Sequence, residues 1–369
     1  MRLAHLALAL TALTLTACAA DQPLAPTAHR ADATATAESN GATRLSFLSR
    51  NLYVGTNLDL VVQALASPNP ADDFPAVIQS VGEIQATAWE SRVIGLVDEI
   101  ERARPAVIGL QEVWNLNVNL TPFGVAVNID QNFLASVQGE LASRGLTYDV
   151  AATITNTAAN PLPGISIVDF DVILVDPARV TVVPSSVVSQ TFAANIGPVA
   201  AGVTILRGWV SVRATVDGVP LTSANTHLEA GISPQLSGLR ALQTGQLMGA
   251  LASAEPVVLM GDFNDDPGSP MYNIIANAGF ADVWRTMRPG VEGLTCCFSP
   301  VLDDANANGA FTQRIDYVFA RGLAQQNGQL LGKVDIIGAT PSSRLQGPTT
   351  MIWPSDHAGL TVDLLIPRD

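Results

Sequence analysis

Residues 255–268 read EPVVLMGDFNDDPG, an apolar run that ends in a glycine and a group of polar side chains. A short apolar run such as Val257 to Met260 is typical of a strand that is covered on both faces. Polar residues just past such a strand lie where open α/β sheets bind ligands. Asp262 and Asn264 are two residues apart, so an extended backbone places both on one side. We predict a buried strand with a functional edge; the alternative is an acidic, solvated turn.

The composition excludes several classes of protein. The chain has 369 residues, of which 48% are hydrophobic and 14% charged, so it can bury a large core and is not a disordered chain. Its formal net charge is −14, and Lys333 is its one lysine. Because binding to long nucleic acids depends on Lys and Arg that neutralise phosphates, avid DNA binding is disfavoured.

The N-terminus reads MRLAHLALALTALTLTAC, with one positive charge before an apolar stretch that ends in small residues. This pattern predicts a secretory signal, and it is too short for a transmembrane helix. Residues 15–18 resemble the bacterial lipobox, so we predict a lipoprotein signal peptide over 1–17 and lipidation of Cys18. The alternative is an ordinary signal peptide. In either case we expect an exported protein, membrane-anchored or secreted.

Residues 18–43 have no periodic apolar face and are interpreted as a flexible tether. Residues 44–369 contain no segment that resembles a linker and are interpreted as one domain. Within it, residues 76–103 have the spacing of one amphipathic helix, and 106–113 of a buried strand that ends in Gln-Glu. Helices alternate with strands in both halves, which favours an α/β domain of layered sheets.

Five polar clusters lie at the ends of predicted strands. A sixth places Asp316 inside an apolar strand, where a buried carboxylate needs a partner. The two histidines beyond the tether, His227 and His357, both fall in these clusters, whereas a lone histidine is more often structural. The clusters are SRNL at 49–52, QEV at 111–113, NTHL at 225–228, GDFN at 261–264, RIDYV at 314–318 and SDH at 355–357.

The ordered set NL, QE, NTHL, GDFN, RIDY and SDH resembles the endonuclease/exonuclease/phosphatase superfamily over residues 44–366. That group includes pancreatic-type deoxyribonucleases, inositol polyphosphate 5-phosphatases and bacterial sphingomyelinases. The resemblance implies an α/β four-layer sandwich in which helices flank two central mixed β-sheets. It also implies a metal-dependent phosphoesterase site at one edge.

Glu112 is a lone carboxylate at the end of a hydrophobic strand, where it is either a surface acid or a metal ligand. With Asn51 it can supply oxygen ligands to Mg²⁺, which keeps several waters and needs only one or two carboxylates. The resemblance implies that Glu112 is the principal metal ligand, with Asn51 beside it and Asp356 as a second acid. We expect Mg²⁺ as cofactor, with Mn²⁺ or Ca²⁺ as alternatives.

A histidine oriented by a carboxylate can accept a proton from water near neutral pH. The resemblance implies that His357 is this base and that Asp316 orients it, although Asp316 also has Arg314 as a nearby structural partner. It further assigns Asp262 to the water or the leaving group and Asn264 to the transition state. His227 is then a donor to the scissile phosphate.

The middle of the domain departs from the nucleases of this group, which have a tyrosine and an arginine there. Residues 167–174 read IVDFDVIL, which contains neither, so a nucleic-acid substrate is in doubt. Asp171 occupies a fitting place for substrate binding, and Asn225 is a second candidate as a support for the neighbouring histidine. Arg207 or Arg213 can replace the missing arginine.

Three further features have simpler interpretations. Asp265 and Asp266 lie outside the motif and are interpreted as solvated turn residues. Cys296 and Cys297 are adjacent and can form a vicinal disulfide after export. With no histidine nearby in the sequence they make a poor zinc site, so we interpret them as structural. The apolar stretch 192–199 either contacts a membrane or folds onto the core.

The sequence therefore predicts an extracytoplasmic Mg²⁺-dependent phosphodiester hydrolase that uses a metal-bound phosphate and a His-activated water, in the manner of a sphingomyelinase or phospholipase. A secreted nuclease is the alternative enzyme, and a surface lipoprotein without catalysis is an alternative of another class. The expected partners are a phosphate-ester substrate and a membrane reached through lipidated Cys18. We expect no stable nucleic-acid complex, and a monomer.

Overall fold

The structure is a computed structural model that describes residues 41–200, 202–323 and 330–366. The predicted signal peptide, Cys18 and most of the predicted tether lie outside the described residues. Two large sheets account for most of the strands. The first sheet runs, in spatial order, β15 (Leu331–Ile337), β18 (Gly359–Ile366), β1 (Thr43–Asn51), β2 (Val107–Asn119), β5 (Ile165–Val175), β4 (Asp149–Ala159), β9 (Val203–Ile205) and β8 (Gly197–Ala200), with β3 (Asn128–Asn132) beside β2.

The second sheet packs against the first, and both are mixed, because each contains parallel and antiparallel pairs. Its order is β13 (Ala281–Asp282), β14 (Asp316–Arg321), β12 (Val257–Asp262), β11 (Val219–His227), β10 (Gly208–Val216) and β6 (Val180–Val182), with β7 (Val188–Thr191) beside β10. A small separate pair consists of β16 (Leu345–Gln346) and β17 (Met351–Ile352).

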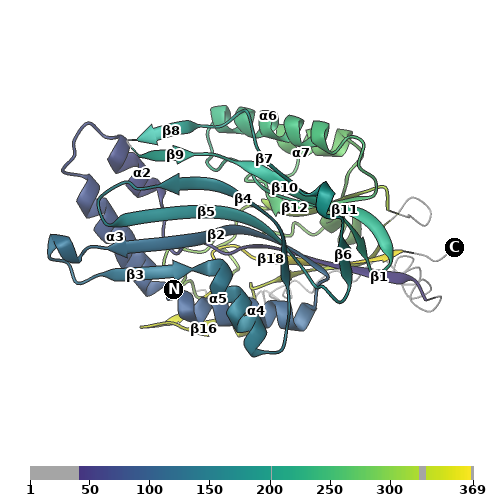
Figure 1. Cartoon of the computed structure of the whole chain (residues 1–369), viewed down its shortest axis with the longest axis horizontal. Coiled ribbons are helices and arrows are strands. Elements are labelled where there is room, and N and C mark those ends of the chain that lie inside the picture. The colour runs from purple at the N-terminus through teal and green to yellow at the C-terminus, as the bar shows by residue number, and fades with distance from the viewer. Residues whose placement is uncertain (1–40, 201, 324–329, 367–369) are drawn as a thin grey trace, which may run out of the picture.

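Helices cover the outer faces of the two sheets (Figure 1). The helices are α2 (Asp59–Ala66), α3 (Asp73–Ala86), α4 (Trp89–Ala103), α5 (Phe133–Ser143), α6 (Pro234–Ala250), α7 (Pro270–Asn277) and α8 (Val283–Met287), and short 3₁₀ turns span Thr121–Phe123, Pro184–Ser186 and Pro341–Ser343. None of the helices in the described ranges has the length and apolarity needed to cross a membrane.

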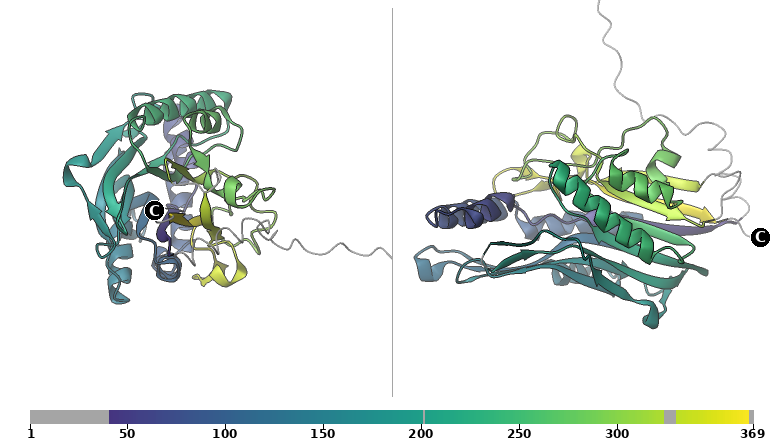
Figure 2. Two further views of the ribbon diagram at one scale, coloured as in Figure 1. Left: turned by 90° about the vertical axis from the view of Figure 1, so that its right-hand side faces the viewer. Right: turned by 90° about the horizontal axis from the view of Figure 1, so that it is seen from above.

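Three apolar clusters hold four layers together. Side chains of α3, α4 and α5 pack on the first sheet, and those of α6 and α7 pack on the second. Between them lies a cluster shared by the two sheets, whose strands form two layers in Figure 2. In β12, Val258 and Met260 face this inner cluster while Val257 and Leu259 face α6 and α7. The prediction of a strand covered on both faces, and of a four-layer α/β sandwich, is confirmed.

Two predicted elements differ from the structure. The predicted helix over 76–103 is divided into α3 and α4, because Ala88 adopts a left-handed backbone with φ of 38°. The strand predicted to end in Gln-Glu continues to Asn119 as β2. Its register with β5 shifts between Leu110 and Val113, and Glu112 has a φ of 53° within this irregularity. A bulge thus redirects Glu112 without ending the strand.

The sheets align the polar ends of their strands. Asn51, His227 and Asp262 are the last residues of β1, β11 and β12. In the second sheet His227 pairs with Asp262, and Asp262 pairs with Asp316 on β14. In the first sheet Asn51 pairs with Gln111. Residues far apart in the sequence are therefore brought to one end of the sandwich.

A buried ion pair supports this end of the fold. The guanidinium of Arg50 donates to both carboxylate oxygens of Glu99, at 3.0 and 3.1 Å, and also to the backbone carbonyl of His357. Both side chains of the pair are 2% exposed. Burial raises the pKa of Glu99, and Arg50 opposes that rise. The pair therefore anchors the backbone that carries His357.

Glu99→Gln is expected to lower the free energy of unfolding by about 3–5 kcal/mol, because it leaves the buried charge of Arg50 without its counter-ion. Urea unfolding of both proteins measures the difference. The control is Asp363→Asn, which breaks the pair with Arg44, whose side chain is 57% exposed. That change is expected to cost about 0–1 kcal/mol. Equal losses in the two variants would contradict the prediction.

Candidate active site

The apolar run Val257 to Met260 is followed by Gly261 because a larger residue does not fit at that position. A Cβ at this position would overlap the carbonyl oxygen of Thr226 on the neighbouring strand β11. The close approach lets Asp262 and His227 stand side by side, with Asp262 Oδ2 3.6 Å from His227 Nε2. Asp262 Oδ1 accepts a hydrogen bond from the backbone N–H of Asn264, at 3.0 Å. The turn after β12 is thereby closed around the Asp262 carboxylate.

Glu112 and Asn51 lie together, as the sequence predicted. The Asn51 amide donates to Glu112 Oε1 and to Asp262 Oδ2, at 3.1 Å each, and so links the two sheets. Glu112 Oε2 accepts from the backbone N–H of Val54 at 3.0 Å and from the indole of Trp114 at 3.3 Å. The Glu112 carboxylate is therefore held by donors on three sides.

His357 is held by Asp316, as the resemblance implied. The distance from His357 Nδ1 to Asp316 Oδ2 is 2.9 Å. Because a carboxylate accepts, Nδ1 is the donor, and Nε2 is left to face Asp262 Oδ2 at 3.8 Å and Asp356 Oδ1 at 3.9 Å. Burial alone would lower the pKa of His357, but the three carboxylates raise it well above its usual value. Arg314, the alternative partner of Asp316, instead pairs with Asp282.

His227 is fixed as a neutral donor by Arg207. Arg207 Nη1 lies 3.0 Å from His227 Nδ1, and an arginine can only donate, so Nδ1 accepts. The proton of the neutral ring is then on Nε2. Burial, Arg207 and His357 all lower the pKa of His227, which keeps the ring neutral. His227 thus presents an N–H toward Asp262.

Of the two arginines proposed from the sequence, the structure places Arg207 at the site. Arg213 lies on β10 with its side chain exposed. Arg207 Nη1 is 3.8 Å from Asp169 Oδ2, and its Nε is 3.6 Å from Glu229 Oε1. Neither acid was identified from the sequence, because strand position alone does not show which acids turn toward a distant arginine.

Two substrate-binding predictions need correction. Asn225 is fully buried, accepts from the Gln111 amide at 2.6 Å, and donates to carbonyls of both β2 and β5. It joins the two sheets and cannot contact a substrate. Asp171 is also fully buried, and Asp169, two residues earlier on β5, lines the cleft in its place. Burial raises the pKa of Asp171 to about 7.

Asp265 and Asp266, in the turn after β12, were predicted to be solvated, and the structure differs from this prediction. Asp265 pairs with Arg240 of α6 at 3.1 Å. Asp266 accepts from the backbone N–H of Arg314 at 2.9 Å. These carboxylates tie the turn to α6 and to the segment before β14, so they are structural anchors and not solvated residues.

A divalent cation fits the crowded carboxylates at this site. Burial and Asp316 raise the pKa of Asp262 to about 7. Burial and Glu112 raise the pKa of Asp356 to about 7. Such crowding of oxygen ligands is the environment that a hard cation such as Mg²⁺ stabilises. Asp262, Asp316 and His357 place their ligand atoms within 4.8 Å of one another, so they too can take part in holding a metal ion.

Arg92 ties two loops of the site together, and the sequence did not single it out. Its side chain is 1% exposed. It donates to the carbonyls of Leu52 and Tyr53 after β1, at 2.7 and 3.0 Å, and to that of Pro354 at 3.1 Å. The segment that carries Asp356 and His357 is thereby held against the segment after Asn51.

The site opens into a cleft of about 650 Å³ with apolar walls. One wall is formed by α2 and the β8–β9 hairpin, which lie next to each other in Figure 1. Its apolar lining includes Val61, Leu65, Val199, Val203 and Ile205. Arg207 is the one arginine or lysine among the described residues that line the cleft, whereas six acids do so. The cleft suits an apolar group better than a polyanion.

The apolar stretch 192–199 folds onto the core at its start and lines the cleft at its end. Phe192 is 3% exposed and packs beside Trp209 in the core under α6. Ile196 and Val199 line the cleft, and Ile196 is 40% exposed.

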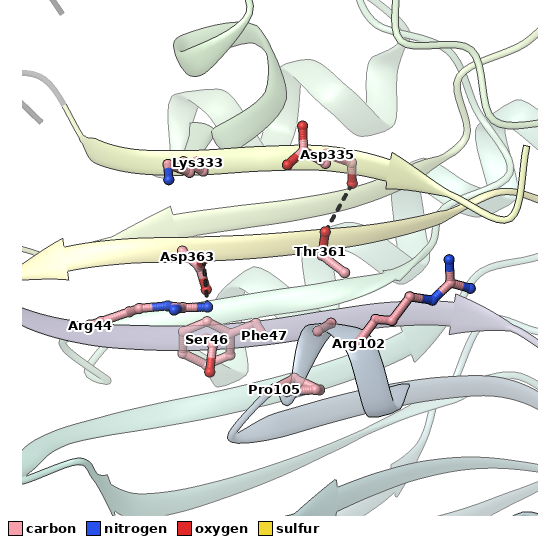
Figure 3. A pocket seen from close by; sticks show the side chains of 10 residues that line it. Arg44, Ser46, Phe47, Arg102, Pro105, Lys333, Asp335, Thr361 and Asp363 are labelled. Carbon is pink, nitrogen blue, oxygen red and sulfur yellow. Dashed lines mark hydrogen bonds and ion pairs between the residues drawn. The ribbon is translucent and has the colours of Figure 1, made fainter. Parts of the chain in front are cut away.

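A second hollow, of about 200 Å³, lies near the start of β1 (Figure 3), whereas Asn51 of the candidate site is the last residue of that strand. Figure 3 shows that Arg44 is paired with Asp363 and that Thr361 contacts Asp335. The predicted catalytic residues do not line this hollow.

Comparison with known proteins decides the family. Residues 78–357 match the profile of the Endonuclease/Exonuclease/phosphatase family, a span that ends on His357. The chain belongs to this family. Members of the family hydrolyse phosphoesters and generally depend on divalent metals.

The family's fold is found in two similar solved structures. A family protein from Leptotrichia buccalis is 15% identical, with a TM-score of 0.53, and the match covers 87% of this chain and 99% of that one. One from Bacteroides thetaiotaomicron is also 15% identical, with a TM-score of 0.51, and the match covers 88% and 98%. At this identity the likeness concerns the fold.

A curated relative shares a shorter segment. The Ccr4 exoribonuclease subunit of the CCR4-Not complex from Coccidioides immitis is 29% identical over 129 residues. The match covers 31% of this chain and 17% of that protein.

Replacing Arg207 tests whether this side chain contributes to phosphoester hydrolysis. Arg207→Gln is expected to lower kcat/KM by roughly 10- to 150-fold, because it removes a charged donor worth about 1.5–3 kcal/mol. Steady-state kinetics on a hydrolysed phosphoester measures the loss. Arg213→Gln, a change at the exposed arginine, is the matched control and is expected to stay within about twofold. A similar loss in both variants would contradict the assignment.

Proposed function

We propose that this chain is an exported, Mg²⁺-dependent phosphodiester hydrolase whose substrate has an apolar group beside the phosphate, as phospholipids and sphingomyelin do. The observation that carries the proposal is the position of His357, Asp262 and Glu112 along a cleft with apolar walls and one arginine. An apolar group gains about 25 cal/mol for each Å² that it buries in such a cleft. A nucleic acid would find one arginine where it needs several cations.

In this proposal each side chain has one task. The carboxylates that raise the pKa of His357 would be offset by a bound cation, so that the neutral ring of this histidine accepts a proton from water at Nε2 while Asp316 holds the ring. His227 donates its Nε2–H to a phosphate oxygen, and Asn264 contacts the developing charge. Asp262 orients the water or the leaving oxygen.

Glu112, Asn51 and Asp356 would hold Mg²⁺. When bound there, the cation polarises the phosphoryl group and neutralises charge that develops on its oxygens.

Export and anchoring belong to the same proposal. The signal pattern over 1–17 and the lipobox-like Cys18 support a lipoprotein of the bacterial cell envelope. An enzyme anchored there meets lipid substrates without crossing a membrane. One acyl chain gives marginal binding, so we propose that more than one chain on Cys18 holds the protein.

A substrate panel tests the function. The full chain is incubated with Mg²⁺ and, separately, short-chain phosphatidylcholine, sphingomyelin, plasmid DNA or a phosphomonoester. The proposal expects the phospholipids to give the highest kcat/KM, and expects the Glu112→Gln variant to lose that activity. Preference for DNA would establish the nuclease alternative. If no phosphoester were hydrolysed, or if the variant were as active as the wild type, the proposal would fail.

A further inference from the structure

Two cysteines that the function does not use lie against the proposed base. Cys296 Sγ is 3.8 Å from His357 Nε2, and Cys297 Sγ is 4.0 Å from the same atom. The sequence gives no sign of this, since about 60 residues separate the cysteines from the histidine. The interpretation of the pair as a purely structural feature, remote from any histidine, therefore needs correction.

The backbone fixes this arrangement. Cys296 forms β-bridges with His357 and with Gln313. The N–H of Ala358 donates to the carbonyl of Thr295 at 2.8 Å, and the N–H of Cys296 donates to the carbonyl of Gln313 at 3.1 Å. The sulfur atoms are thus placed next to the ring by main-chain pairing and not by a flexible loop.

The sulfur-to-nitrogen distances suit a tetrahedral zinc ion, whereas the two bonded sulfurs must separate on reduction before both can bind it. With Zn–S near about 2.3 Å and Zn–N near about 2.0 Å, tetrahedral angles place sulfur and nitrogen about 3.5 Å apart. The two observed separations are slightly longer than this, and all three ligand atoms lie within 4.8 Å of one another. The ring is also prepared for the role, because a histidine ligand commonly donates its other N–H to a carboxylate, as His357 Nδ1 does to Asp316.

The oxidation state of the pair controls the site. In the structure Cys296 and Cys297 are bonded to each other, and a metal needs their thiolates. Two equivalents of a thiol reductant convert the disulfide into two thiols and release one reductant disulfide. Zinc then displaces a proton from each thiol as two Zn–S bonds form. Cys297 lines the cleft, so the reductant and the ion have a path to the pair.

We propose that reduction turns Cys296, Cys297 and His357 into a Zn²⁺ site, and that zinc there removes His357 from proton transfer. The soft sulfur ligands distinguish this site from the oxygen ligands that suit Mg²⁺. The oxidised pair leaves Nε2 of His357 free for water. The enzyme is then active where disulfides persist and is inhibited by zinc where they are reduced; this regulation rests on the proposed function, whereas the metal site itself does not.

Metal binding is the first test, and it needs no substrate. The full chain, reduced with a phosphine and saturated with Mg²⁺, is dialysed against Zn²⁺ or Co²⁺. We expect one tightly bound Zn²⁺ per chain, and with Co²⁺ a sulfur-to-metal charge-transfer band. The double variant Cys296→Ser/Cys297→Ser and the oxidised wild type are each expected to bind roughly 100-fold more weakly or worse, because two of three ligands are lost. Cys18→Ser is the matched cysteine control and should bind as the wild type does.

Inhibition is the second test. Zn²⁺ should inhibit Mg²⁺-dependent hydrolysis by the reduced wild type, with each protein normalised to its own activity without zinc. The double-serine variant and the oxidised wild type should need roughly 100-fold more Zn²⁺. Equal zinc uptake or equal inhibition in reduced and oxidised wild type would overturn the proposal, and that comparison uses one sequence, so a misfolded variant cannot obscure it. Because dialysis is independent of hydrolysis, a wrong substrate class would leave the zinc-binding result unchanged.

Discussion

His357→Gln is expected to lower kcat by about 10²–10⁴-fold with little change in KM, because it removes the proposed acceptor of the proton from water. The glutamine side-chain amide can still donate to Asp316, whose distance from His357 Nδ1 is 2.9 Å, so the buried carboxylate keeps a partner. Single-turnover kinetics on the preferred phosphoester separates the chemical step from binding and release.

The companion variant Asp316→Asn distinguishes a base from a merely structural histidine. An amide can donate to Nδ1, which favours the tautomer with its proton on Nε2 and so blocks the acceptor. We expect a loss of the same order as for His357→Gln, and a double variant no worse than either single one. Losses that multiply would show that the two residues act independently and would contradict the pairing.

Glu112→Gln is expected to lower kcat/KM at fixed Mg²⁺ by about 10³-fold, since a bound cation contributes several kcal/mol to transition-state stabilisation. The glutamine still offers an oxygen to the Val54 N–H and the Trp114 indole, so the fold is expected to persist. A titration of rate against Mg²⁺ measures the effect, and a higher Mg²⁺ concentration should restore part of it. Chelation of divalent ions should reduce the wild type to the level of the variant.

The control for this experiment is Asp335→Asn. That carboxylate is 60% exposed, pairs with Arg288 at 2.6 Å, and lies at the hollow shown in Figure 3. Its replacement should leave the Mg²⁺ dependence unchanged. If Asp335→Asn and Glu112→Gln shifted the Mg²⁺ titration alike, the assignment of the metal ligand would be wrong.

Local patterns in the sequence predict a layered α/β domain and the polar strand ends, whereas the four-layer sandwich and the roles of the site residues were implied by the resemblance to the family. The run Val257 to Met260 shows its burial by its length and apolarity, and the glycine that follows shows its close packing. His227 and Asp262 end their strands, and His357 lies just before the last one. The pairing of strands within each sheet, which the local patterns do not give, brings these residues to one edge.

The remainder of the site depends on long-range geometry that no local pattern contains. The bulge at Glu112 leaves no mark in the sequence, because the residues on both sides of it continue a strand. Asp169 and Asp171 alternate identically on β5, yet only the former lines the cleft. Arg207 reaches His227 from a segment that shows no motif. Asn225 lies in the same polar cluster of the sequence as His227. Its side-chain amide, however, donates to backbone carbonyls of β2 and β5 between the two sheets.

The clamp made by Arg92 has a consequence for how the protein is produced. It joins the carbonyl of Leu52 to that of Pro354, and β18, the last described strand, pairs with the first strand β1. A nascent chain emerging from the ribosome therefore lacks the complete candidate site until residues beyond Pro354, His357 among them, have emerged. The candidate site is therefore completed only when the last described strand closes on the first, because β18 pairs with β1.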